Sequence, residues 1–96
     1  MNHVRKTSNY TASVLDFVEG DTTAVPFTVM LPPLSGCTSG DKISVQLFAS
    51  DDPANQLTVD GDGSDTINGS LTQSLTYVKE QYNFFPNSDL TDWIMC

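Results

Sequence analysis

Apolar and polar side chains alternate along much of this chain, and a period of two residues is typical of β-strands that bury one face. The clearest case is the segment 42–49, in which Ile, Val and Leu occupy every second position from residue 43. Segment 24–31 alternates in the same way, and Pro26 predicts that this strand begins there or lies at a sheet edge, because proline cannot donate to a ladder. No stretch of ten residues has a helical period, so the pattern predicts an all-β protein.

Turn residues separate the predicted strands at regular intervals. Gly, Pro, Asn and Asp cluster at 19–22, 32–41, 50–55 and 86–89, and further strands are predicted over 10–18, 71–78, 81–85 and 91–96. Short strands that recur about every 8–12 residues indicate a small β-sandwich or barrel of antiparallel strands. We therefore predict a single domain, a β-rich module over 10–96, preceded over 1–9 by a polar N-terminal arm or a first edge strand.

The segment 56–69 joins a predicted strand to two turns. It begins as a half-buried strand, since Leu and Val flank Thr over 57–59. The Asp-Gly-Asp-Gly run over 60–63 favours a turn, because glycine adopts backbone angles closed to other residues. One apolar side chain, Ile67, then precedes Asn68-Gly69, a strong signal for a tight turn. We predict that this segment sets the register of the strands on either side.

The chain of 96 residues is acidic, with a formal net charge of −8. This charge balance predicts no nucleic-acid partner, since nucleic-acid binding requires a basic footprint. Three basic side chains nevertheless fall close together near the N-terminus, His3, Arg5 and Lys6, whereas Lys42 and Lys79 are isolated in the sequence. The basic group predicts either an arm that docks on an acidic surface or a frayed terminus.

The small size and low charge density of the chain favour oligomerisation. A domain of this length buries only about 60–65% of its unfolded surface, and association with other copies adds buried area. Only 17% of the residues are charged, against an average of about 25%. Part of a largely uncharged surface would then be covered by neighbouring subunits. No apolar run suits a signal peptide or a membrane span, so we expect neither.

Candidate catalytic groups are sparse. His3 is the only histidine, so we expect no Ser-His-Asp or Cys-His arrangement for nucleophilic catalysis. The nominal carboxylate pairs for glycoside hydrolysis are Asp51-Asp52 and Asp89 with Asp92. Nothing else supports such a reaction, and the prediction is that the protein is not an enzyme.

A calcium site is the other chemistry that the sequence suggests. Asp60, Asp62, Ser64 and Asp65 would offer oxygen ligands, but Leu71 stands where an EF-hand loop needs its bidentate Glu. We therefore expect a turn with solvated aspartates, no bound metal and no cofactor.

The two cysteines show no pattern of a metal or redox site. Cys37 and Cys96 lack metal-ligand spacing and do not form a CxxC motif. In a reducing cytoplasm both would remain thiols. Cys37 lies in a Ser-Gly-Cys-Thr-Ser-Gly loop that would allow an exposed thiol, but no base is evident to activate it.

Several short motifs follow one another along the chain. They are Tyr-Thr-Ala-Ser-Val-Leu-Asp (10–16), Pro-Phe-Thr-Val-Met-Leu-Pro-Pro (26–33), Gly-Asp-Lys-Ile-Ser-Val (40–45), Leu-Thr-Val (57–59) and Asp-Thr-Ile-Asn-Gly (65–69). Tyr82 then matches a recurrent aromatic position, and Trp93-Ile94 a closing tryptophan strand. In this order the motifs resemble a small β-rich module of tailed-phage appendage proteins. That module occurs in tail fibre and tail spike tips and in capsid decoration or head-spike proteins.

The resemblance implies a homotrimeric structural protein of the virion, made in the host cytoplasm. We expect a capsid decoration or head-spike protein that binds the major capsid protein or another virion protein through its N-terminal arm. His3, Arg5 and Lys6 would make that attachment. The alternative is a receptor-binding tip of a tail fibre, which would recognise a glycan or protein of the host surface.

The chain departs from the module at 84–89, where Phe-Phe-Pro-Asn-Ser-Asp replaces a shorter aliphatic strand and an Asp-Gly turn. Aromatic residues in and near this segment would fill the core or an oligomer interface, or form a ligand surface. The residues predicted for a trimer interface or ligand surface are Tyr82, Phe84, Phe85 and Trp93.

Overall fold

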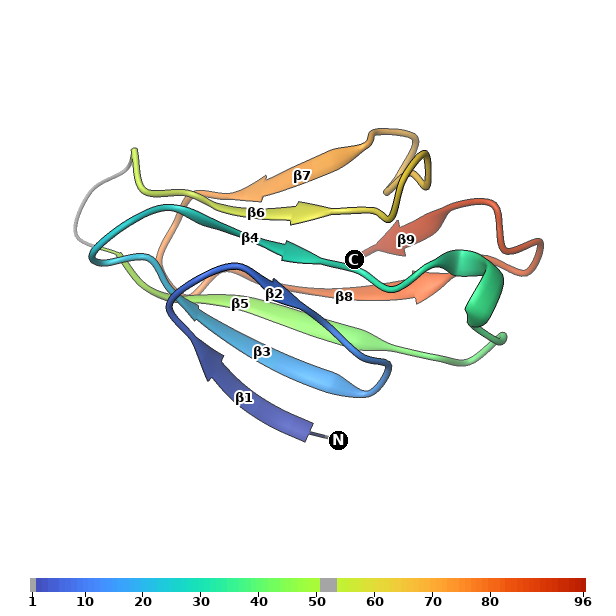
Figure 1. Ribbon diagram of the computed structural model, residues 1–96, viewed down its shortest axis with the longest axis horizontal. Coiled ribbons are helices and arrows are strands. Elements are labelled where there is room, and N and C mark those ends of the chain that lie inside the picture. The colour runs from blue at the N-terminus through green and yellow to red at the C-terminus, as the bar shows by residue number, and fades with distance from the viewer. Residues whose placement is uncertain (1, 51–53) are drawn as a thin grey trace.

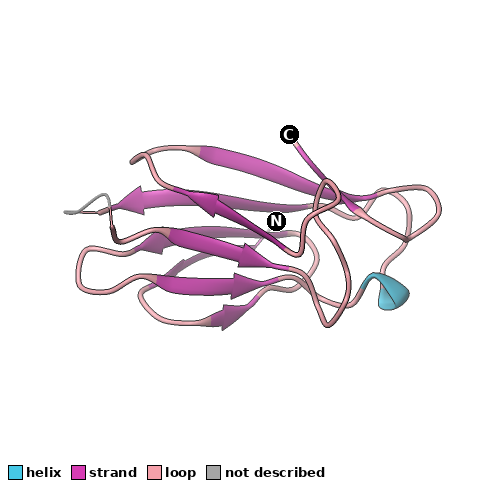
Figure 2. Ribbon diagram, turned by 90° about the horizontal axis from the view of Figure 1, so that it is seen from above, coloured by secondary structure: helices cyan, strands magenta, loops and turns pink. Residues whose placement is uncertain are grey.

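Two β-sheets pack against each other in the computed structural model, which describes residues 2–50 and 54–96 (Figure 1). The strands run along the long axis of the molecule in both ribbon views (Figures 1 and 2). Helical structure in the described residues is limited to a short 3₁₀ segment, and no helix there is long and apolar enough to cross a bilayer. In chain order the elements are β1 (Asn2–Lys6), β2 (Tyr10–Thr11), β3 (Asp16–Asp21), β4 (Phe27–Met30), η1 (Leu34–Gly36), β5 (Ile43–Ala49), β6 (Leu57–Asp60), β7 (Thr72–Leu75), β8 (Gln81–Pro86) and β9 (Trp93–Met95).

The chain crosses to the other sheet after each of its first five strands. The strand order is β1-β3-β5-β8-β9 in the larger sheet, here sheet A, and β2-β4-β6-β7 in the smaller, sheet B. Because every second strand returns to the same sheet in the same direction, β1, β3 and β5 are parallel, and so are β2, β4 and β6. The remaining pairs, β6–β7, β5–β8 and β8–β9, are antiparallel. The all-β prediction is confirmed, but the prediction of antiparallel strands is wrong for the four pairings among the first six strands, which are all parallel.

This error has a physical reason. Alternation of side chains shows which residues face the core, and it is the same in parallel and antiparallel strands. Strands adjacent in sequence usually pair, which favours antiparallel hairpins. Here β6 and β7 are the first consecutive strands that pair with each other. Earlier in the chain each crossover between parallel strands contains a strand of the opposite sheet, so a helix is not needed to make it.

The core lies between the sheets and uses alternate positions of the central strands. Ile43, Val45 and Leu47 of β5 are fully buried, as the alternation predicts. Phe27 and Val29 of β4 belong to the same buried cluster, so the half-buried strand predicted over 24–31 is confirmed. Other buried apolar members are Ala12, Val18, Leu31, Leu34, Cys37, Leu57, Val59, Ile67, Leu75, Phe84 and Trp93.

One predicted turn is a strand instead. The segment 19–22 was predicted as a turn because of its glycine, yet β3 continues through residue 21. Gly20 is buried, and a Cβ at this position would overlap the side chain of Leu57 in β6. The glycine therefore serves close packing between the two sheets, which is a common reason for glycine within a strand. The strand predicted over 10–18 is also divided, since a turn separates β2 from β3.

The tight turn predicted at Asn68-Gly69 is confirmed. Both residues have left-handed backbone angles, with φ of 49° at Asn68 and 84° at Gly69. Ile67 precedes the turn and is fully buried, and it forms an isolated bridge with Ser70 across the turn.

This turn also occupies the outer edge of β9. The Asn68 N–H donates to the Trp93 carbonyl at 2.8 Å, and the Trp93 N–H donates to the Thr66 carbonyl at 2.8 Å. The Asn68 side chain accepts a hydrogen bond from the Met95 N–H at 3.1 Å and donates to the Met95 carbonyl at 3.3 Å. A connection within sheet B thereby joins the two sheets along one side.

The N-terminal segment is the outermost strand of sheet A, at the lower side of the molecule in Figure 1. Its parallel pairing with β3 runs from Asn2 opposite Asp16 to Lys6 opposite Gly20. Of the two possibilities raised for this segment, an arm or a first edge strand, residues 2–6 adopt the second.

The turn after β6 supplies a test of the fold. A Cβ at Gly61 would overlap the backbone carbonyl of Asp65, whereas one at Gly36 would meet nothing within 4 Å. Overpacking against backbone costs about 1–3 kcal/mol. We expect Gly61→Ala to lower the free energy of unfolding by about 2 kcal/mol in urea titrations. The matched control, Gly36→Ala, should change it by less than about 0.5 kcal/mol. Equal stability of the two variants would contradict the close approach.

Candidate functional site

The basic residues predicted for attachment lie on β1, and the outer edge of that strand carries no pairing partner within residues 2–50 and 54–96. The Asn2 N–H donates to the Leu15 carbonyl at 2.8 Å, on the side of β3. Backbone groups of successive strand residues point to opposite sides. The even-numbered residues of β1 therefore bond to β3, while the N–H and carbonyl groups of His3 and Arg5 point to the open edge.

A single carboxylate holds two of these basic side chains against sheet A. His3 Nε2 lies 3.1 Å from Glu19 Oε1, and Arg5 Nε and Nη2 donate to the same oxygen at 3.3 and 3.2 Å. The side chain of Glu19 is only 15% exposed, against 61% for His3 and 53% for Arg5. Partial burial raises the pKa of Glu19, but the hydrogen bonds from Arg5 and His3 outweigh it and leave this pKa below its ordinary value.

Aromatic rings on the outer face of sheet A support the same side chains. The His3 ring stacks on Phe17 with a centroid distance of 5.0 Å. The Arg5 guanidinium lies 3.8 Å from the centroid of Phe48, and Lys79 Nζ lies 4.0 Å from it. Cation–π contacts of this length are favourable and bring an isolated lysine of the sequence into the basic group.

Lys6 has a separate environment. Its Nζ lies 4.5 Å from the centroid of the Tyr10 ring in β2. The Tyr10 hydroxyl donates to Asp16 Oδ2 at 2.7 Å. The bond to Asp16, followed by burial and the charge of Asp16, raises the pKa of Tyr10. The three predicted residues therefore share one strand, but only His3 and Arg5 share a cluster.

Sequence reasoning missed the partners of this cluster. Glu19 had been assigned to a turn, and Lys79 is far from β1 in the sequence. Phe48 offered a signal, since the alternation over 42–49 places it on the face opposite the core. Its neighbours across the sheet depend on the parallel pairing of β1, β3 and β5, which alternation does not predict.

The four aromatic residues predicted for an interface or ligand surface divide into two groups. Phe84 and Trp93 are fully buried in the core, so neither contacts a ligand or a second subunit in this fold. Tyr82 and Phe85 are half-buried. Phe85 lies opposite Ile94 in the β8–β9 ladder, and Ile94 is 45% exposed. Phe85 alternates with two buried neighbours, and Ile94 lies between the buried Trp93 and the half-buried Met95, so Phe85 and Ile94 form an apolar patch on the outer face of sheet A.

The half-buried Tyr82 is engaged within its own subunit. Its hydroxyl donates to Glu80 Oε2 at 2.7 Å. Glu80 Oε1 accepts the backbone N–H groups of Thr76 at 3.0 Å and Tyr77 at 3.3 Å. Burial raises the pKa of Glu80, and the hydrogen bonds from Tyr82, Tyr77 and Thr76 lower it further than burial raises it. Glu80 thus stabilises the turn between β7 and β8.

Of the aspartates in the turn after β6, Asp65 has a structural role. Asp65 Oδ2 accepts the N–H of Leu34 at 2.9 Å, which anchors η1 to this turn. The expectation of solvated aspartates is therefore wrong for Asp65, although Asp62 and Ser64 are exposed. In the part of the chain that the structure describes, no three His, Cys, Asp or Glu side chains gather as metal ligands would.

Of the two thiols, the one at Cys37 is not exposed, although its loop sequence would allow exposure. Cys37 is buried, and its Sγ donates to the Pro33 carbonyl at 3.4 Å. Burial is the main factor that raises the pKa of this thiol, and the charges of Asp41 and Asp65 add to it. Cys96 is exposed, and both cysteines are free thiols.

One of the two carboxylate pairs considered for glycoside hydrolysis, Asp89 with Asp92, lies within the described residues. Asp51 and Asp52 lie outside the residues that the structure describes. Asp92 Oδ1 accepts the Thr66 hydroxyl at 2.7 Å and the Gly69 N–H at 3.2 Å. Asp92 therefore holds the 66–69 turn against β9.

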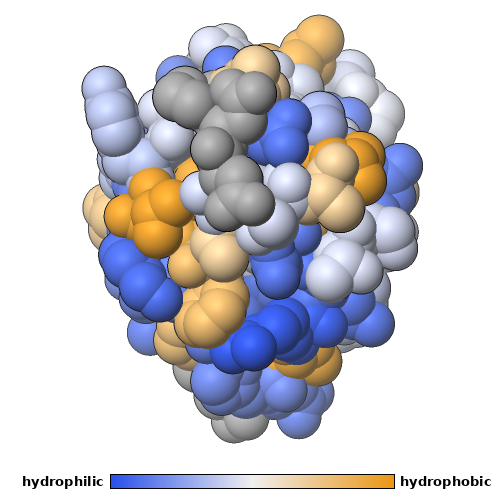
Figure 3. Space-filling view, turned by 90° about the vertical axis from the view of Figure 1, so that its left-hand side faces the viewer, coloured by the Kyte–Doolittle hydropathy of each residue, from blue (hydrophilic) through white to orange (hydrophobic). Residues whose placement is uncertain are grey.

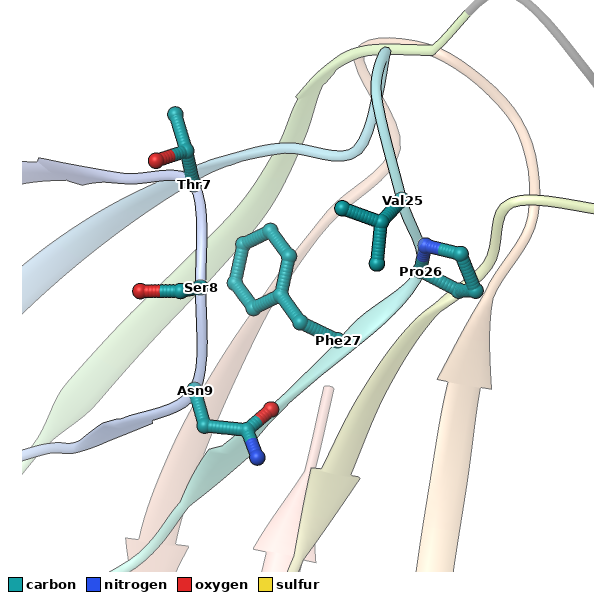
Figure 4. Close-up of a pocket in the computed structure, with 6 residues that line it drawn as sticks. All are labelled: Thr7, Ser8, Asn9, Val25, Pro26 and Phe27. Atoms are coloured by element: carbon teal, nitrogen blue, oxygen red, sulfur yellow. The ribbon is translucent and has the colours of Figure 1, made fainter.

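A hollow of about 390 Å³ opens at one end of the sandwich. Figure 4 shows the Phe27 ring between the loop that leads into β2 and the segment that leads into β4. One wall is polar and the other apolar, and together they comprise Thr7, Ser8, Asn9, Val25, Pro26 and Phe27. Apolar groups lie among polar ones on this end of the molecule (Figure 3). Exposed side chains of the neighbouring loops include Val25, Val78 and Tyr77, the last 75% exposed.

The hydrogen bonds of Glu80 predict how stability depends on pH. Its folded-state pKa lies below the ordinary value of 4.5, so its contribution to stability is present above that pH and is lost as pH falls through the folded pKa. We expect Glu80→Gln to flatten the decline in unfolding free energy between about pH 5 and pH 3, measured by urea titration. Tyr82→Phe removes one donor and should give an intermediate slope. A wild-type slope in Glu80→Gln would contradict the assignment.

Searches with this sequence found no matching protein-family model and no matching curated protein. The functional argument therefore rests on the residues and geometry described above, and foremost on the basic edge strand of sheet A.

Proposed function

We propose that this protein is a structural virion protein, a capsid decoration or head-spike protein of a tailed phage that attaches to the shell through β1. One observation carries the proposal, namely the basic group on a strand edge of an acidic molecule that no other strand of the described residues pairs with. Three of the five Lys, Arg and His residues lie on β1, while the whole chain has a formal net charge of −8.

This distribution of charge suits a protein that stands out from a shell. An acidic body is repelled by other acidic surfaces and keeps neighbouring molecules apart in solution. A basic edge on the same body is attracted to acidic side chains of the capsid protein and orients the molecule as it approaches. Attachment of this kind weakens as ionic strength rises, because exposed charges are screened.

The proposal includes a homotrimer. Phe85 and Ile94 supply an apolar patch on the outer face of sheet A, at the side of the sheet opposite β1. Burial of this patch against neighbouring copies would remove exposed apolar area from water, at about 25 cal/mol per Å². Assembly through one side of the sheet leaves β1 of each subunit accessible to the shell.

The hollow at the end of the sandwich favours a second candidate function, a receptor-binding tip of a tail fibre. Its polar wall offers hydroxyl and amide groups, and its apolar wall offers Phe27, Pro26 and Val25. A sugar needs both, since its hydroxyls form hydrogen bonds and its CH groups pack on apolar surface. This reading places the functional surface at the loops rather than at β1.

Attachment to particles tests the leading proposal. We expect the double variant Arg5→Gln/Lys6→Gln to lose at least tenfold in occupancy on particles of the phage that encodes the protein, because it removes two charges from β1. The matched control, Lys42→Glu, changes the net charge by the same two units, but at a residue just before β5 rather than on β1, and should retain occupancy more closely. Occupancy is measured by quantitative electrophoresis of washed particles, and cryo-EM locates the protein on them.

Two outcomes would contradict this function. Equal occupancy of the double variant and the control would exclude attachment through β1. Absence of the protein from the capsid, combined with binding of the isolated protein to host cells, would favour the receptor-binding tip instead.

Sedimentation equilibrium tests the trimer. A carboxylate placed in the Phe85–Ile94 patch would be desolvated at an interface, which is costly. We expect Ile94→Asp to convert a trimer into monomers, while its melting curve stays two-state. Leu71→Asp is the matched control, because Leu71 is also exposed but lies in sheet B's β6–β7 connection. A wild-type protein that sediments as a monomer would exclude the trimer.

A further inference from the structure

The two edges of sheet A differ in a way that indicates a use for one of them. At β9 the backbone of Trp93 bonds to residues 66 and 68, and that of Met95 bonds to the Asn68 side chain. This edge is closed to further pairing. At β1, no other segment of the described chain pairs with the outer edge. Soluble proteins usually protect strand edges, so an edge left open beside a protected one is a candidate for pairing with another chain.

The open groups on β1 have the spacing that an incoming strand requires. The N–H and carbonyl groups of His3 and Arg5 point away from β3, as the bond from Asn2 to Leu15 establishes. His3 and Arg5 are two residues apart, which is about 6.6 Å along the strand. An incoming strand presents its own outward N–H and carbonyl groups at the same interval. Five residues of parallel pairing to β3 hold β1 extended before any partner arrives. Little conformational entropy would then be lost by β1 on binding.

Basic side chains at this edge select the kind of strand. His3 and Arg5 project on the outer face of the sheet, and a strand added beside them places its side chains about 5 Å from theirs. Arg5 uses Nε and Nη2 on Glu19, which leaves Nη1 for a second carboxylate. A second copy of this chain does not fit, because pairing β1 with β1 would bring the same basic residues together, and like charges opposite one another are unfavourable.

We propose that β1 accepts an additional β-strand from its partner, and that this strand is an extended protein segment with acidic side chains. The inference rests on the proposed attachment to the virion and specifies how it occurs. Main-chain hydrogen bonds to His3 and Arg5 supply affinity, and carboxylates beside their side chains supply specificity. The partner segment adds to sheet A as a sixth strand.

Proline substitutions separate main-chain pairing from side-chain contacts. His3→Pro removes an outward N–H and no bond to β3, whereas His3→Ala removes the same side chain and keeps the N–H. The probe is a nine-residue peptide that alternates Glu and Thr, compared with one that alternates Lys and Thr. Binding is followed by NMR titration, and amide hydrogen exchange is measured at residues 3 and 5.

We expect the Glu peptide to bind, to slow exchange of the His3 and Arg5 amides, and to bind His3→Pro at least tenfold more weakly than His3→Ala. Val4→Pro serves as the structural control, because the Val4 N–H points toward β3 and its loss should lower the melting temperature where His3→Pro does not. Equal binding of the Glu and Lys peptides, or equal binding by His3→Pro and His3→Ala, would overturn the inference.

The virion role and the strand addition fail in different ways. If His3→Pro retains full occupancy on particles, strand addition is excluded and attachment by charge remains. If the Glu peptide binds as expected but the protein is absent from particles, the virion role is excluded and the binding edge remains.

Discussion

The hydrogen bonds between the 66–68 turn and β9 are the constraint on which the rest of the fold depends. They join a connection of sheet B to the last strand of sheet A, so the two layers cannot separate along that side. Trp93 lies at this junction, fully buried, and its indole N–H has no hydrogen-bond partner among the described residues. Such an N–H costs about 1–3 kcal/mol. Hydrogen bonds hold the backbone of Trp93, whereas packing of the large ring must hold its side chain in place.

Because the 66–68 turn bonds to β9, the two edges of sheet A differ. Near β9 the outer face is apolar, with Phe85 beside Ile94. Near β1 it is basic and aromatic, with Arg5 over Phe48 and His3 over Phe17. Our proposal assigns the apolar side to contacts between copies of the chain and the basic side to a different partner, which would leave the acidic remainder of the molecule facing solvent.

Several features of this arrangement follow from short-range rules that the sequence obeys. The buried face of β5 and the half-buried β4 are visible as alternation, and Asn68-Gly69 is visible as turn chemistry. Glycine was misleading at residue 20, where the need is for close packing against Leu57 rather than for a turn. Because glycine has no side chain, it suits both a turn and the close packing of a strand against another sheet, and the sequence alone does not distinguish the two.

The amino-acid sequence by itself determined that this is an all-β chain with an acidic surface, a basic N-terminal segment and aromatic residues to fill a core. Local chemistry decides these properties, and each can be evaluated over a few neighbouring residues. Only the tertiary structure decided that the first six strands pair in parallel within each sheet, that Phe84 and Trp93 are buried, and that Glu19 and Phe48 meet Arg5. Those contacts join distant segments through the crossing of the chain between two sheets, and alternation carries no information about which strands become neighbours.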